Sequence, residues 1–129
     1  MKTEYQQSET DCGPAAVATL CGVSVQDASQ YIYGKLGRKG VTSSGYLVGA
    51  IEHFGRRPLA DRCSSFKEDH ELPNFEFDAL LGCDCLVLDD SGRYKRSSHW
   101  AVWDMSDQCI RDPYGYYYPL LIRKFLLVR

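Results

Sequence analysis

The sequence of 129 residues lacks any apolar stretch of about 20 residues, the length that a helix needs to span a bilayer. Its first residues, Met1 to Gln6, also lack the apolar run that a signal peptide carries. We therefore expect no membrane partner and a cytoplasmic location.

Positive charge is scarce as well. The formal net charge is -2, and the basic residues form only two short groups, around Lys35 and around Lys95. Binding to nucleic acid or to an anionic membrane requires a larger basic surface, so neither partner is expected. The group around Lys95 precedes His99 closely enough to line a cleft beside it.

A metal-binding pattern is missing. The chain has 6 cysteines and 3 histidines, and Cys83 and Cys85 alternate so that they share one face of a predicted strand. Two further ligands at a suitable spacing are not visible, so no metal and no other cofactor is expected. Without an export signal, a disulfide framework is also the less favoured interpretation of the cysteines.

The composition that is present is typical of a compact globular chain, with 44% hydrophobic and 25% charged residues. A chain of this length can bury a substantial core. Internal repeats, low-complexity tracts and linker-like stretches are absent from the sequence. We therefore expect one domain over residues 1–129.

Helical patterns fill the first half of the chain and strand patterns fill the second. The helices are expected after Cys12, over 24–34 with Ser24 as the cap, and over 44–54. The strands are expected around Arg57–Ala60, Cys85–Asp89, His99–Trp103, Cys109–Asp112 and within Tyr117–Val128, with a flexible insertion at 61–74. This order predicts an α+β fold in which N-terminal helices pack against a C-terminal antiparallel sheet.

Cys12 is the candidate nucleophile. It lies directly before small and apolar residues that predict a helix. The first turn of a helix has unpaired backbone N–H groups and a partial positive charge, and both favour a thiolate. Cysteine is also among the most frequently buried residue types, so a packing role is the alternative for Cys12 taken alone.

A base and a group to orient it are found in the last third of the chain. His99 begins a predicted strand, and Asp112 ends the strand that returns beside it. A hairpin symmetric about the Met105-Ser106 pair joins residues whose numbers add to 211, which places His99 opposite Asp112. Opposed side chains share a face at about 5 Å, whereas a slip of one residue would separate them. With Cys12, this pair completes an expected triad.

Each of these residues also has a structural interpretation. His99 is at the start of a strand, where it can be a satisfied edge residue, and Asp112 before Pro113 is a common way to begin a turn. Two other histidines are rival bases. His53 closes a predicted helix, where a cation complements the helix dipole, and His70 lies in a polar run and is expected to be solvated.

At these positions the chain resembles the papain-like cysteine peptidases that process double-glycine leader peptides, best known as N-terminal domains of bacteriocin-exporting transporters. The chain has no transporter segment of its own. The resemblance spans nearly the whole chain, but its specific patches are few. They are Gln6, the run 11–16 around Cys12, the pair His99-Trp100, and the pair Asp112-Pro113.

The resemblance implies a papain-like fold and four site residues. Cys12 would be the nucleophile, His99 the general base and acid, and Asp112 the orienting carboxylate. Gln6 would donate its side-chain N–H to an oxyanion, together with the backbone N–H of Cys12. Gln6 is preferred to Gln7 only because of the spacing in that family.

The expected function is therefore that of a thiol peptidase or amidase that cleaves a peptide or isopeptide bond in a peptide or protein substrate. The resemblance implies small residues such as Gly-Gly before the cleaved bond. Two alternatives are open at this point. An acyltransferase would use the same triad but pass the acyl group to an amine, and a catalytically idle domain would bind glycine-rich peptide tails.

Overall fold

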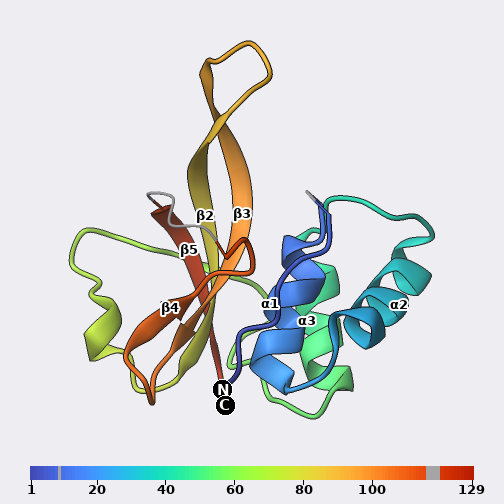
Figure 1. Cartoon of the computed structure of the whole chain (residues 1–129). Coiled ribbons are helices and arrows are strands. Elements are labelled where there is room, and N and C mark those ends of the chain that lie inside the picture. Colours follow the sequence, from blue (N-terminus) through green and yellow to red (C-terminus); the bar gives the residue numbers. More distant parts are fainter. Residues whose placement is uncertain (9, 116–119) are drawn as a thin grey trace.

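The computed structural model describes residues 1–8, 10–115 and 120–129, and it is an α+β structure (Figure 1). Within these residues, three helices accompany a five-stranded antiparallel sheet in the order β1-β5-β2-β3-β4. The elements are α1 (Cys12–Cys21), α2 (Val25–Leu36), α3 (Ser44–His53), β1 (Ser64–Ser65), the short 3-10 helix η1 (Leu72–Asn74), β2 (Asp78–Leu88), β3 (Tyr94–Asp104), β4 (Cys109–Arg111) and β5 (Leu120–Val128). The predicted α+β class, with helices first and an antiparallel sheet after them, is confirmed.

Helix α1 is the central helix. It packs against α2, α3 and β3, and Ala15, Ala16 and Ala18 are fully buried. These small side chains allow close approach on every side, since a helix that is apolar all round is suited to a core position. Gly22 ends the helix in the left-handed conformation, with φ of 69°. The first residue of α1 is thus held rigidly beside the sheet.

Helix α2 begins where the sequence predicts. The Ser24 side chain accepts a hydrogen bond from the Asp27 backbone N–H at 3.0 Å, which is the expected cap. The helix continues to Leu36, past the predicted end, and stops at Gly37 with φ of 78°.

The sheet has two buried faces. Leu80, Trp100 and Leu126 are in the core shared with the three helices. Leu81 and Trp103 belong to a second cluster on the other face. The alternation follows from the two-residue period of a strand, and it places consecutive residues of β3 on opposite faces.

The segment 61–74 is attached to the sheet, and the prediction of a flexible insertion was wrong. Two of its residues form β1 and pair with β5. The His70 ring lies 5.1 Å from the Phe125 ring, and its Nδ1 accepts a hydrogen bond from the Lys67 N–H at 2.8 Å. Phe66 and Phe75 complete this aromatic cluster, so burial of rings anchors a segment whose sequence is largely polar.

Several strand predictions need adjustment. The expected strand Arg57–Ala60 is reduced to a bridge between Pro58 and Val128, which hydrogen bonds from the N–H groups of Arg57 and Leu59 accompany on either side. The last strand begins at Leu120 among the described residues, and the part predicted over 117–119 lies outside them.

Strands β2 and β3 are much longer than predicted, and Figure 1 shows their hairpin rising beyond the helices. Its turn is closed by a hydrogen bond from the Asp89 N–H to the Arg93 carbonyl at 2.8 Å. Across the described part of the chain, every helix is too short or too polar to cross a membrane.

Candidate functional site

Cys12 is the first residue of α1, and its side chain is almost fully buried, with 9% of the residue exposed. Asp11 precedes the helix but its side chain makes no capping hydrogen bond. Instead, the Tyr33 hydroxyl donates a hydrogen bond to Asp11 Oδ1 at 2.7 Å. In the first turn, Pro14 has no N–H and the Ala15 N–H donates to the Asp11 carbonyl at 3.0 Å. The N–H groups of Cys12 and Gly13 are those without a partner inside the helix.

Tyr33 is a firm anchor for this turn. Burial, the hydrogen bond to Asp11 and the charge of Asp11 raise the pKa of Tyr33 well above its usual range. The phenol therefore stays protonated and keeps donating to Asp11 at any pH of interest. This contact ties the residue before Cys12 to helix α2.

His99 is on β3, and its side chain is 3% exposed. Its Nε2 lies 2.6 Å from Asp112 Oδ1. Cys12 lines one cleft together with His99 and is close enough to raise the pKa of the ring. The three side chains that were predicted to converge are thus brought together.

The electrostatics favour a charged ring at His99. Burial lowers its pKa, but hydrogen bonds to Asp112 and Cys12 and the negative charges of both groups raise it, and the net result is a pKa of about 9. A protonated imidazole beside a sulfur is the arrangement that supports a thiolate and imidazolium pair.

The register that produces this contact differs from the predicted one. Val102 pairs with Arg111 and Asp104 with Cys109, so partner numbers add to 213 and not to 211. His99 and Asp112 are therefore not directly opposed, and Asp112 lies just past the end of β4. A shift of two residues keeps both side chains on one face of the sheet. His99 and Asp112 are therefore in contact although the predicted register was wrong.

The turn after β4 holds Asp112 in place. Its Oδ1 also accepts a hydrogen bond from the Tyr114 N–H at 2.9 Å, and its carbonyl accepts one from the Gly115 N–H at 3.1 Å. Gly115 has φ of 74°, a conformation that favours glycine. The turn thus positions the Asp112 carboxylate independently of its contact with His99.

The N-terminal segment lies against the same turn. The Gln6 N–H donates to the Pro113 carbonyl at 2.9 Å, which links Gln6 to the residue after Asp112. The Gln6 side-chain N–H donates to the Ser8 carbonyl at 2.8 Å, and its Oε1 is buried without a partner among the described residues. No described contact joins the Gln6 side chain to Cys12, so its predicted role as an oxyanion donor stays a prediction.

Cys12 and His99 line a cleft of about 340 Å³ between the helices and the β2–β3 hairpin. Tyr114 is one wall, with its ring 5.4 Å from the His99 ring. The other walls come from the hairpin and from the loop before α3, and they include Val41, Leu88 and Lys95. Of the basic group around Lys95, Lys95 itself lines the cleft, whereas Arg93 and Arg96 are not among its walls.

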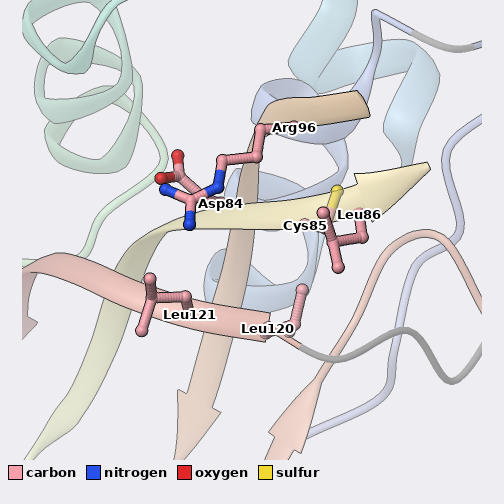
Figure 2. A pocket seen from close by; sticks show the side chains of 6 residues that line it. All are labelled: Asp84, Cys85, Leu86, Arg96, Leu120 and Leu121. Carbon is pink, nitrogen blue, oxygen red and sulfur yellow. The ribbon is translucent and has the colours of Figure 1, made fainter. Parts of the chain in front are cut away.

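A smaller cavity of about 170 Å³ lies further along the sheet, between β2, β3 and β5 (Figure 2). Its walls include Cys85, Arg96 and Leu120. The Cys85 thiol donates a hydrogen bond to the Ser97 carbonyl at 3.5 Å, and burial raises its pKa. Cys85 is therefore a protonated thiol in an apolar cavity, which is a poor environment for a nucleophile.

The other titratable candidates do not form a site. Burial raises the pKa of Cys83 to about 12 and that of Cys21 to about 11, so both remain thiols. The rival base His53 stacks on Tyr31 with the ring centres 3.9 Å apart. Over residues 1–8, 10–115 and 120–129, no cluster of His, Cys, Asp and Glu side chains could hold a metal ion.

Sequence reasoning missed two features of the site. The link from Tyr33 to Asp11 joins positions 22 apart, and no local pattern signals it. For the tyrosine run that begins at Tyr114, the sequence favours an ordinary half-buried strand and has a wall of the cleft as the alternative; Tyr114 lies in the turn after Asp112 and forms a wall of the cleft. Tyr116, Tyr117 and Tyr118, the other tyrosines of this run, lie outside the described residues.

In comparisons with known proteins, no family model, no curated protein and no solved structure matches the chain. A functional assignment therefore depends on the chemistry of the residues described above.

Proposed function

We propose that this protein is a papain-like cysteine peptidase or amidase, with Cys12 as nucleophile, His99 as acid and base, and Asp112 as the orienting group. The observation that carries the proposal is the contact chain around His99. Nε2 lies 2.6 Å from Asp112 Oδ1, and the same buried ring lines one cleft with Cys12, whose proximity helps to raise the His99 pKa. A buried cysteine that serves only in packing needs neither a histidine nor a carboxylate beside it.

The proposed reaction begins with attack of the Cys12 thiolate on the carbonyl carbon of an amide. The C–N bond then breaks, and the His99 imidazolium gives its proton to the leaving amine. Water attacks the resulting thioester with neutral His99 accepting its proton, which releases the acid and restores the Cys12 and His99 pair. The pKa of about 9 at His99 means that the proton is available at neutral pH.

Charge on the carbonyl oxygen needs donors during the attack. The backbone N–H of Cys12, the first residue of α1, supplies one side of the oxyanion hole. Gln6 is held against the Asp112 turn by its backbone, and we assign the second donor to its side-chain amide. The resemblance to leader peptidases supports a substrate with small residues such as Gly-Gly before the cleaved bond.

The proposal is tested with a peptide that ends in Gly-Gly and a carbon electrophile, followed by mapping of the modified residue by mass spectrometry. We expect a single adduct on Cys12, and we expect peptide cleavage to be lost in Cys12→Ala while the circular dichroism spectrum is unchanged. Adducts spread over several of the 6 cysteines, or cleavage that persists in Cys12→Ala, would refute the assignment.

A further inference from the structure

A second cavity, of about 430 Å³, adjoins the cleft at the catalytic histidine. The two cavities share Val41, Ser98, His99 and Trp100 as lining residues. A chain that passes over Cys12 and His99 can therefore extend from the cleft into this second cavity. The residues that line this second cavity therefore bear on which substrates the site accepts.

Lys124 is the feature that distinguishes this cavity. Its ammonium lies 4.9 Å from the centre of the Trp100 ring, and Trp100 is the residue directly after His99. The indole N–H of Trp100 donates to the Thr42 carbonyl at 3.1 Å in a buried position, so the ring is fixed. A fixed aromatic face attracts the cation and holds it at the cavity wall.

The sheet is built to admit this lysine. Gly82 on β2 pairs with Trp100 on one side and with Lys124 on the other. A Cβ at position 82 would lie 2.6 Å from Lys124 Cγ and 2.7 Å from its Cε. The lysine chain therefore crosses bare backbone to reach Trp100, and any larger residue at position 82 would displace it.

The charge of Lys124 is not balanced within the cavity. The neighbouring Arg123 forms an ion pair with Asp84, with 2.9 Å between Nε and Oδ2. No carboxylate among the described residues is within ion-pairing distance of Lys124. One cation beside the catalytic histidine is thus available to a ligand.

We propose that Lys124 is a specificity-determining residue that binds a carboxylate of the substrate, on an Asp or Glu close to the cleaved bond. This inference rests on the proposed peptidase function. A substrate acid placed in this cavity forms an ion pair with Lys124 next to an aromatic ring, where partial exclusion of water strengthens the attraction. Small residues at the cleaved bond and an acidic residue near it would then define the preferred sequence.

The test is digestion of a proteome-derived peptide library, with the residues on both sides of each cleaved bond read by mass spectrometry. We expect Asp and Glu to be enriched at one fixed position within about three residues of the cleaved bond, by about tenfold, as for a hydrogen-bonded charge pair. Lys124→Met should abolish the enrichment, and Lys124→Glu should replace it by enrichment of Lys and Arg. Gly82→Ala should weaken it without removing the charge.

The matched control is Lys67→Met, which removes an exposed lysine from the segment before η1 and should leave the preference unchanged. Cleavage that depends on Cys12 but shows no acidic preference, or a preference that survives in Lys124→Met, overturns the role of Lys124 alone. Absence of any cleavage that depends on Cys12 overturns the peptidase function and this inference with it.

Discussion

His99 and Asp112 are in contact although they are not paired in the sheet. The nitrogen and oxygen are 2.6 Å apart, while the ladder between β3 and β4 ends at Arg111. Asp112 reaches His99 from the turn that follows the strand, where the Tyr114 N–H holds its carboxylate. The proposed orienting group is therefore a turn residue that its own turn supports, and it can be exchanged without altering the ladder.

Asp112→Asn should shift the pH dependence of the reaction. The His99 pKa is raised to about 9, so the imidazolium is present below that pH and is lost as the pH rises through it. The falling limb of kcat/KM, which reports groups of the free enzyme, is expected near pH 9 in the native protein. Without the carboxylate, the limb should move to lower pH, toward the ordinary histidine value of about 6.5.

The matched control for this change is Asp61→Asn, at a side chain that is 94% exposed. It should leave the limb in place. A limb at the same pH in Asp112→Asn and in the native protein would mean that Asp112 does not set the charge of His99.

Gln6→Ala should lower kcat by about a hundredfold, the usual loss when one oxyanion donor is removed. Gln7→Ala is the neighbouring control, since Gln7 is exposed, and it should change kcat less than twofold. Steady-state kinetics on one peptide substrate compares the two variants. Equal losses in both, or no loss in Gln6→Ala, would assign the second donor elsewhere.

Tyr33→Phe should disturb the turn that presents Cys12. It removes the hydrogen bond to Asp11 and is expected to lower the free energy of unfolding by about 1 kcal/mol. It should also slow alkylation of Cys12, because Asp11 precedes the sulfur-bearing residue. Tyr94→Phe, at a residue that is 72% exposed, is the control. Urea unfolding and alkylation rates provide the two readouts, and an unchanged alkylation rate would limit Tyr33 to a structural role.

Arg56→Met should destabilise the fold and leave the chemistry intact. One guanidinium nitrogen donates to both the Leu20 carbonyl and Asp78 at 2.9 Å, which joins the end of α1 to the start of β2. We expect a loss of about 2 kcal/mol, since two hydrogen bonds involving charge are removed. Arg62→Met, at a side chain that is 85% exposed, should be neutral. Thermal unfolding measures both, and a neutral Arg56→Met would contradict this linkage.

The site could be predicted from the sequence to the extent that local patterns determine it. The helix after Cys12 is predicted by the small apolar residues that follow it. His99 and Asp112 share a face of the sheet in the predicted register, and they still share it when the strands are shifted by two residues. The loop between the strands could not be placed. Asp104 is 1% exposed, accepts hydrogen bonds from Arg111 and pairs with Cys109, so the loop is 105–108 and the hairpin is not symmetric about Met105-Ser106.

Other features depend on contacts between segments that are distant in the chain. The path of Lys124 over Gly82 requires β5 to lie beside β2, with a register irregularity just after Gly82. The polar segment 61–74 gives no sign that the rings of Phe66 and His70 pack against Phe125. Residue type alone cannot show which rings meet when their separation in the chain exceeds 50 positions.

The central claim is that His99 activates Cys12, and the rate of alkylation at each cysteine tests it most directly. Iodoacetamide labelling at pH 7, resolved by peptide mass spectrometry, should modify Cys12 faster than each of the other five thiols, of which Cys21, Cys63, Cys83 and Cys85 have raised pKa values. His99→Ala should slow the modification of Cys12 by at least about tenfold and leave the other rates unchanged. Equal labelling of Cys12 and the other cysteines, or a Cys12 rate that is the same in His99→Ala, would contradict the account.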